Sequence, residues 1–82
     1  MDISVGSAVE RIARVLAGQR ISSNARGDDP SAADVVDASW QVYREDAIAV
    51  LKTLREPDEA MAAAGDPAVW DAMIRAAIAE AE

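Results

Sequence analysis

The stretch "REPDEAMAAAGDPAVWDAMIRAA" (residues 55–77) contains two helix breaks ten residues apart. Pro57 cannot continue the preceding helix, because its ring lacks an N–H and restricts the residue before it. Asp58 can cap a new short helix over residues 58–64. Gly65 is expected to end that helix in the left-handed conformation. The first break therefore predicts a short corner helix that turns the chain.

The second break predicts the start of the last helix, over residues 67–81. Asp66 can cap this helix, and Pro67 suits its first position, where a missing N–H costs nothing. Apolar side chains then recur at helical spacing and form one stripe. The stripe is Trp70, Ile74, Ala77 and Ala81, with Met73 and Ile78 beside it.

Residues 31–55, before the first break, are expected to form the longest helix. Ser31 with Asp34 is a start signal of the capping-box type. Apolar side chains then recur every three or four residues, which predicts one seam along a helix. The seam is Val36, Trp40, Tyr43, Ala47, Val50 and Leu54, widened on one side by Ile48 and Leu51. Because Asp37 or Ser39 can restart the helix, a separate first piece is the alternative.

Residues 5–20 are expected to form the first helix. Its apolar face repeats at spacings of four, three and four residues, through Val5, Val9, Ile12 and Leu16. Ser7 and Glu10 have the spacing of a capping box, so the regular helix can begin at Ala8; Ser4 is the alternative cap. The polar residues 21–30 then predict a loop.

These segments predict an all-α fold: one domain over residues 1–82, with three main helices and the short corner helix packed as a small antiparallel bundle. Met61, the large apolar residue of the corner helix, is expected to enter the core between the two tryptophan helices. The expected core is Ile12, Leu16, Trp40, Tyr43, Val50, Leu54, Met61, Trp70, Met73 and Ile74.

The composition predicts a thin core. Apolar residues make up 51% of the 82 residues, but 19 of these are alanines, and there is no Phe. Burial of methyl groups stabilises little at about 25 cal/mol per Å². Small domains with weak cores often depend on a disulfide or on oligomerisation, and this chain has no cysteine. The sequence therefore favours a homo-oligomer, expected to be a dimer.

The charge is strongly acidic and unevenly distributed. The net charge is −7, with +2 over residues 1–27 and −9 over residues 28–82. Nucleic-acid binders usually carry a basic patch and a high pI, whereas this chain has a pI near 4.4. We therefore expect no direct contact with nucleic acid. A basic protein, or the basic N-terminal segment of a second copy, is the better complement.

The sequence predicts no enzyme and no catalytic, cofactor-binding or metal-binding residues. It has no His and no Cys, which removes the commonest general base, nucleophile and metal ligands. Acidic residues do cluster near the start of the second helix, where a hard cation is the alternative to capping charge. These residues are Asp28, Asp29, Asp34 and Asp37.

Several other residues have a structural interpretation that we prefer to a functional one. Arg26-Gly27-Asp28 has the letters of an integrin-binding tripeptide and is expected to be a solvated turn. Lys52 is expected to pair with Glu45 or Glu56 on the helix surface. Tyr43, Trp40 and Trp70 are expected in the core, although the two tryptophans are also candidates for a binding platform.

The cytoplasm is the expected location. No run of apolar residues is long enough to cross a membrane. The opening residues are acidic at Asp2 and carry arginines within their apolar part, unlike a signal peptide. The absence of cysteine also fits a reducing compartment.

The segment "WQVYREDAIAVLKTLREPDEAMAAAGDPAVWDAMIRAAIAE" (residues 40–80) resembles small uncharacterised proteobacterial and phage-associated proteins. In that pattern a Trp-and-Tyr helix leads into L-R-E-P-T-x-x-M-x-x-A-G and then W-x-A-M-I-x-A-A-L; "ERIARVL" (residues 10–16) is also similar. The matching residues are Trp40, Tyr43, Leu54 to Pro57, Met61, Ala64, Gly65, Trp70, Ala72 to Ile74 and Ala76 to Ile78. Asp58 replaces a frequent Thr, with the capping role kept, and Ile78 replaces Leu. The resemblance implies a compact helical unit in a bacterial or prophage setting, with no assigned activity.

The sequence as a whole favours a non-enzymatic helical interaction module that self-associates. The alternative is a small acidic regulator or inhibitor that binds a basic surface on another protein, such as a DNA-binding protein. A metal-dependent hydrolase using Asp34 and Asp37 is a third class, which would need a cation to stabilise the chain.

Overall fold

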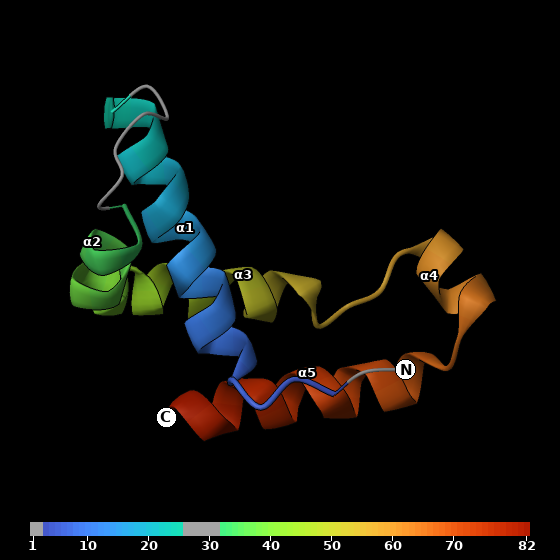
Figure 1. Cartoon of the computed structure of the whole chain (residues 1–82). Helices are drawn as coiled ribbons and strands as arrows, with labels where there is room; N and C mark the ends of the chain where they lie inside the picture. Colours follow the sequence, from blue (N-terminus) through green and yellow to red (C-terminus); the bar gives the residue numbers. More distant parts are fainter. Residues whose placement is uncertain (1–2, 26–31) are drawn as a thin grey trace.

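The computed structural model describes residues 3–25 and 32–82, and every regular element in these ranges is a helix (Figure 1). The fold is all-α, as predicted. In chain order the elements are α1 (Ala8–Ala25), α2 (Ala32–Ser39), the 3-10 helix η1 (Trp40–Tyr43), α3 (Arg44–Leu54), α4 (Glu59–Ala64) and α5 (Pro67–Ala81).

The helices are only partly antiparallel. Figure 1 shows α5 running back along α3, as expected, whereas α1 crosses this pair steeply. α1 packs against α2, η1, α3 and α5, so it is the central element of the fold. The predicted antiparallel bundle is therefore correct for α3 and α5 and wrong for α1.

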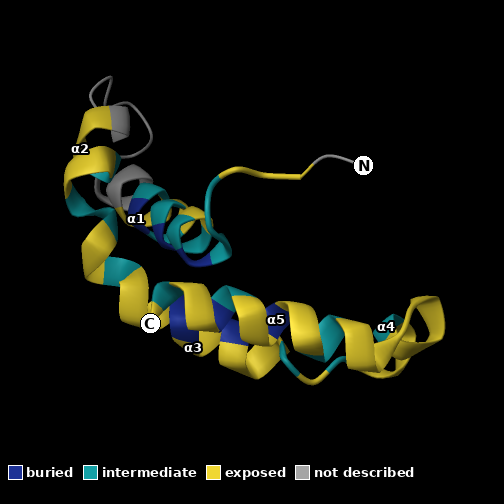
Figure 2. Cartoon of the chain, turned by 90° about the horizontal axis from the view of Figure 1, so that it is seen from below, coloured by how far each residue is buried: buried dark blue, intermediate teal, exposed yellow. Residues whose placement is uncertain are grey.

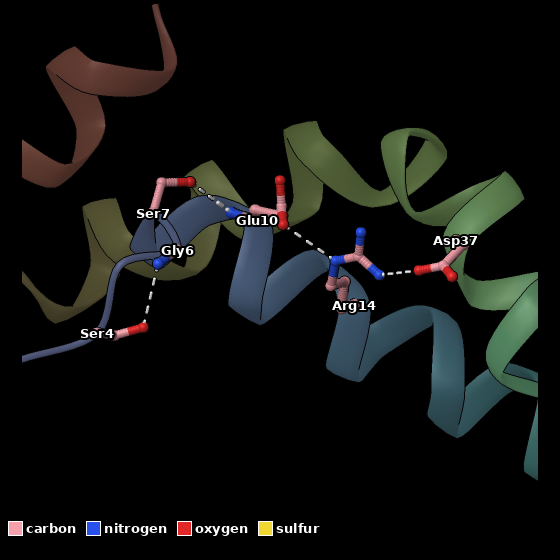
Figure 3. Close-up of polar contacts among 6 residues, drawn as sticks. All are labelled: Ser4, Gly6, Ser7, Glu10, Arg14 and Asp37. Atoms are coloured by element: carbon pink, nitrogen blue, oxygen red, sulfur yellow. Dashed lines mark hydrogen bonds and ion pairs between the residues drawn. The ribbon is translucent and has the colours of Figure 1, made fainter.

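The start of α1 follows the predicted cap, and its end does not. The Glu10 N–H donates to Ser7 Oγ at 3.1 Å, which fixes the first turn at Ala8 (Figure 3). Ser4 Oγ accepts from the Gly6 N–H, so it does not cap the helix. The helix continues to Ala25, past the expected end at residue 20. Polar residues favoured a loop there, but serine and asparagine reduce helix propensity only by tenths of a kcal/mol.

The second expected helix is divided by η1. Ser39 Oγ donates to the Val35 carbonyl oxygen at 2.6 Å. Such a bond back to the preceding turn competes with the backbone ladder and bends helices. Ser39 and Tyr43 also leave the helical region, with φ/ψ of −124°/−4° and −96°/6°. The continuous helix over 31–55 was therefore wrong, and the alternative restart near Ser39 agrees with the structure.

The corner forms as predicted except at its glycine. Asp58 accepts from the Met61 N–H at 2.9 Å and caps α4, while Asp66 accepts from the Ala68 N–H at 2.9 Å and caps α5. Gly65 has φ −161° and ψ −165°, which is extended backbone and not the predicted left-handed conformation. The chain leaves α4 without a left-handed turn because the Asp66 cap begins the next helix at once.

The core lies where α1, α3 and α5 face one another, and it differs from the expected set (Figure 2). The buried residues are Val9, Ala13, Ala17, Ala47, Ile48, Leu51, Ile74 and Ile78. Among the residues expected there, Ile74 is buried, whereas Ile12, Trp40, Tyr43 and Trp70 only pack against the cluster. Val50, Leu54 and Met73 are exposed, and Met61, only half-buried, does not join the cluster.

The shift of the core within α3 has a local cause. The expected seam continued through Val50 and Leu54, but Ile48 and Leu51 are buried instead. A 3-10 helix has 3.0 residues per turn, so η1 interrupts the α-helical progression on which the seam was based. The face after η1 is therefore not the continuation of the face before it.

Small residues allow α1 to approach its neighbours closely. Ala13, Ala17 and Ala47 are each 0% exposed, and the described side chains with complete burial are all alanines. A methyl group added to Gly18 would lie 3.9 Å from Val36 Cγ2, in ordinary contact. The alanine-rich composition thus produces a real but shallow core.

Arg14 joins the basic first helix to the acidic part of the same chain (Figure 3). Its guanidinium donates to Glu10 at 3.1 Å and to Asp37 on α2. The guanidinium carbon lies 5.5 Å from the centre of the Trp40 ring, which is a cation–π contact. Hydrogen bonds to Asp37 and then Glu10 raise the pKa of Arg14. The three side chains are between 36% and 66% exposed, so solvent screens the network, which orients α2 on α1 more than it stabilises the fold.

Candidate functional site

An apolar groove lies between α1, α3 and α5. Its volume is about 460 Å³, and the only charged side chain in its lining is Arg11. The lining residues are Ala8, Arg11, Ile12, Val15, Leu16, Leu51, Leu54, Trp70 and Ile74. The first five come from α1, because the steep crossing of α1 over α3 leaves one of its apolar edges uncovered. We call this hollow the α1 groove.

A second hollow lies at the corner of the chain. It has a volume of about 410 Å³ between α4 and the first turns of α5. Its lining is Pro57, Met61, Ala64, Gly65, Asp66, Pro67, Val69, Trp70 and Met73. α4 contributes no buried residue, so the corner helix frames this hollow instead of closing the core. We call it the corner pocket.

Trp70 lines both hollows and so lies where they adjoin. Its indole Nε1–H donates to the Leu54 carbonyl oxygen at 2.6 Å, which fixes the ring against the last turn of α3. That carbonyl belongs to a helix end, where backbone acceptors lack intrahelical partners. We call the two hollows, with Trp70 shared between their linings, the apolar strip.

The large apolar side chains of the strip are exposed. Val15 and Met73 are each 62% exposed, Val69 is 53% exposed and Leu54 is 42% exposed. Single exposed apolar residues are ordinary on protein surfaces, but contiguous ones mark interaction sites. These four lie within the linings of two adjoining hollows, so the strip is the strongest candidate for a functional surface.

The two ends of the strip carry opposite charge. At the α1 end, the exposed Arg11 lines the groove. At the corner end, residues 56–69 hold four acids and no Lys or Arg. These acids are Glu56, Asp58, Glu59 and Asp66, all exposed. In Figure 1 the corner with α4 projects beyond the end of α3, away from α1.

The acidic residues considered as a cation site do not form one in the described structure. Asp37 is engaged by Arg14, and Asp34 lies exposed in the first turn of α2. Within residues 3–25 and 32–82, acidic side chains nowhere gather in threes to hold a metal. Asp28 and Asp29 lie outside the described residues, as does the Arg26-Gly27-Asp28 turn.

Other expected interactions have different outcomes. In the described part of the chain Lys52 forms no ion pair with Glu45 or Glu56; the pairs on this side are those of Asp71, with Arg75 at 2.7 Å and Arg55 at 3.7 Å. Asp71 thereby joins the end of α3 to α5. Trp40 and Trp70 were expected in the core, and both only pack beside the core cluster; Trp70 also lines the two hollows.

Sequence reasoning missed Val15 and Val69 as surface residues. Neither lies on the apolar stripe of its helix. Their position outside the stripe was the signal available in the sequence. An apolar residue outside the core-facing stripe has no partner within the bundle, so it marks a second apolar face. Met73 was misassigned to the core because it lies next to the stripe.

Comparison of the chain with known protein families, curated proteins and solved structures gives no match. None of the helices that the structure describes has both the length and the apolar character needed to cross a lipid bilayer.

Proposed function

We propose that the chain is a non-enzymatic helical interaction module that self-associates as a dimer through the apolar strip. The observation that carries this proposal is the distribution of apolar side chains. Within the described residues only alanines are completely buried, while Val15, Leu54, Val69 and Met73 remain exposed in the linings of the two hollows. A second copy that covers the strip would bury the larger side chains that the single chain leaves in water.

The extended shape also supports the proposal. The Cα radius of gyration is 14.9 Å, whereas a compact domain of this length has about 12 Å. The longest dimension is 41 Å against 26 and 25 Å across. The projecting corner accounts for much of this length (Figure 1). Small chains that bury little surface alone are often stable only as oligomers.

The dependence of thermal unfolding on protein concentration tests this proposal. When a dimer unfolds to separate chains, mass action raises its midpoint with concentration. We expect the Tm, followed by helical circular dichroism, to rise steadily over a concentration range of about a hundredfold. A Tm that is constant over this range would contradict self-association.

A second candidate function rests on the charge of the corner. We propose, as the alternative, a regulator whose acidic corner binds a basic surface on another protein. Asp66 lines the apolar corner pocket, and three more carboxylates lie within residues 56–59, which suits an apolar side chain flanked by Lys or Arg. A monomeric chain that binds a basic amphipathic peptide in a salt-sensitive manner, and not its acidic counterpart, would support this function.

The setting that we propose is the bacterial cytoplasm. The absence of cysteine from the sequence supports a reducing compartment. The resemblance of residues 40–80 to proteobacterial and phage-associated proteins supports the bacterial setting. Fractionation of cells that express the full chain tests the location, and recovery in the periplasm would contradict it.

A further inference from the structure

We infer that two copies of the chain pair through their apolar strips about a two-fold axis, so that the α1 end of each strip meets the corner end of the other. This inference rests on the proposed self-association through the strip and adds the orientation of the two copies and the occupant of each corner pocket. The occupant of each corner pocket is then the Arg11–Val15 edge of the partner's α1.

Shape and apolar character support this pairing first. The corner pocket is open and apolar, with a volume of about 410 Å³. Val15, 62% exposed, is the most exposed apolar side chain in the lining of the α1 groove, at the other end of the strip. Helix edges that dock into apolar grooves are a common form of recognition. Each copy therefore presents both an insert and a receptor.

Charge complementarity sets the orientation. Arg11 lies at the α1 end, and the corner end has no Lys or Arg among residues 56–69. A parallel pairing would place arginines against arginines and carboxylates against carboxylates, and like charges across an interface are repulsive. An antiparallel pairing places each Arg11 near the partner's acidic rim. Two strips are thus complementary in charge only in the antiparallel orientation.

A two-fold axis also closes the assembly. Because Trp70 lines both hollows, it lies between the two ends and close to the expected axis. Two identical contacts then form on either side of it, which gives a closed dimer and leaves no free strip for further copies. A head-to-tail contact repeated from copy to copy would instead produce an open filament.

Charge reversal at two exposed positions tests the pairing. Arg11→Glu places like charge in both contacts of a homodimer, and Glu59→Arg does the same from the other side. Neither residue forms an ion pair within the described part of the chain. We expect each variant alone to weaken dimerisation roughly tenfold at low salt. Mixed in equal amounts, they should recover wild-type affinity, because each contact of the mixed dimer again joins opposite charges.

The apolar half of the contact needs a matched pair of variants. Met73→Gln changes a 62% exposed residue of the corner pocket, whereas Val42→Gln changes a 78% exposed residue of η1 that lines neither hollow. We expect dimerisation to weaken at least tenfold in Met73→Gln and to be unchanged in Val42→Gln. Circular dichroism of each variant confirms that the fold is retained.

The results of these experiments distinguish the antiparallel pairing from self-association in general. A wild-type chain that is monomeric overturns both. A wild-type dimer that responds to Met73→Gln but not to Arg11→Glu or Glu59→Arg overturns the pairing and leaves self-association through the strip intact. A wild-type dimer that does not respond to Met73→Gln overturns the strip as the dimer surface as well. Two weakened single variants that fail to recover on mixing also overturn the pairing, because the charges would then not face each other.

Discussion

Trp70 has two roles that follow from its position in α5. One part of its ring packs beside the core cluster, and its indole N–H bonds the Leu54 carbonyl oxygen at 2.6 Å. A tryptophan with one apolar end and one polar end suits the boundary between core and surface. Its ring therefore holds the corner against α3 and forms the middle of the apolar strip.

Replacement of Trp70 by Phe removes the indole N–H and keeps an aromatic ring. We expect Trp70→Phe to lower the free energy of unfolding by about 1 kcal/mol, the net value of an ordinary hydrogen bond. Chemical denaturation followed by circular dichroism measures this. The control is Trp40→Phe, since no described hydrogen bond depends on the Trp40 indole. An equal cost at both positions would show that the bond to Leu54 contributes nothing.

Gly65 was wrongly predicted to be left-handed, and a substitution there tests its backbone conformation. Its backbone is extended, and a methyl group added there would meet no atom within 4 Å. We expect Gly65→Ala to raise the free energy of unfolding by about 0.5 kcal/mol, because alanine has less conformational freedom in the unfolded chain. A loss of about 1 kcal/mol in a denaturation experiment would instead indicate the left-handed conformation that the sequence suggested.

At the scale of elements, α4 and α5 have similar N-terminal caps but contribute differently to the core. Asp58 and Asp66 each accept a backbone N–H at 2.9 Å. α5 then contributes Ile74 and Ile78 to the core, while α4 contributes no buried residue. The stability of α5 is therefore coupled to global unfolding, and that of α4 is mostly local.

The two caps can be compared directly by substitution. We expect Asp66→Ala to lower the global free energy of unfolding by about 1 kcal/mol. Asp58→Ala should change global stability less and should speed amide hydrogen exchange within residues 59–64. Denaturation and hydrogen exchange of both variants measure these effects. Equal global costs would mean that the corner helix unfolds together with the core.

The elements that the sequence predicted well are those with strong local signals. The proline and aspartate residues at both breaks, and Ser7 before α1, act on their own backbone, so their effect can be deduced without the fold. η1 was missed as an element because its cause includes a hydroxyl of Ser39 bonded to Val35, one of several conformations open to serine. The extent of α1 was also missed, because serine and asparagine disfavour a helix only weakly.

At the scale of the whole molecule, the thin core and the open strip are two results of the same composition. Alanines allow the helices to approach closely, but several larger apolar side chains, such as Val15 and Met73, remain exposed. The sequence showed the shortage of core and the uneven charge. It did not show which apolar residues would remain outside, because that depends on the crossing of α1 over α3 and on the interruption at η1.

The site was accordingly less predictable than the fold. Met61, Val69 and Met73 adjoin in space because the corner brings two helices together, and Val15 meets the same strip from a helix more than forty residues earlier. No local pattern encodes that meeting. The opposite charges of the two ends were visible in the sequence, but their positions on one continuous surface were not.

The most direct test of the central claim is the solution mass of the wild-type chain by light scattering over a dilution series. We expect a mass about twice the 8.7 kDa of one chain at micromolar concentration, falling toward that of one chain on dilution. High salt should shift the balance toward single chains, because it screens the contacts between the ends of the strips. A mass of one chain at every concentration, at low and high salt alike, would contradict self-association through the apolar strip.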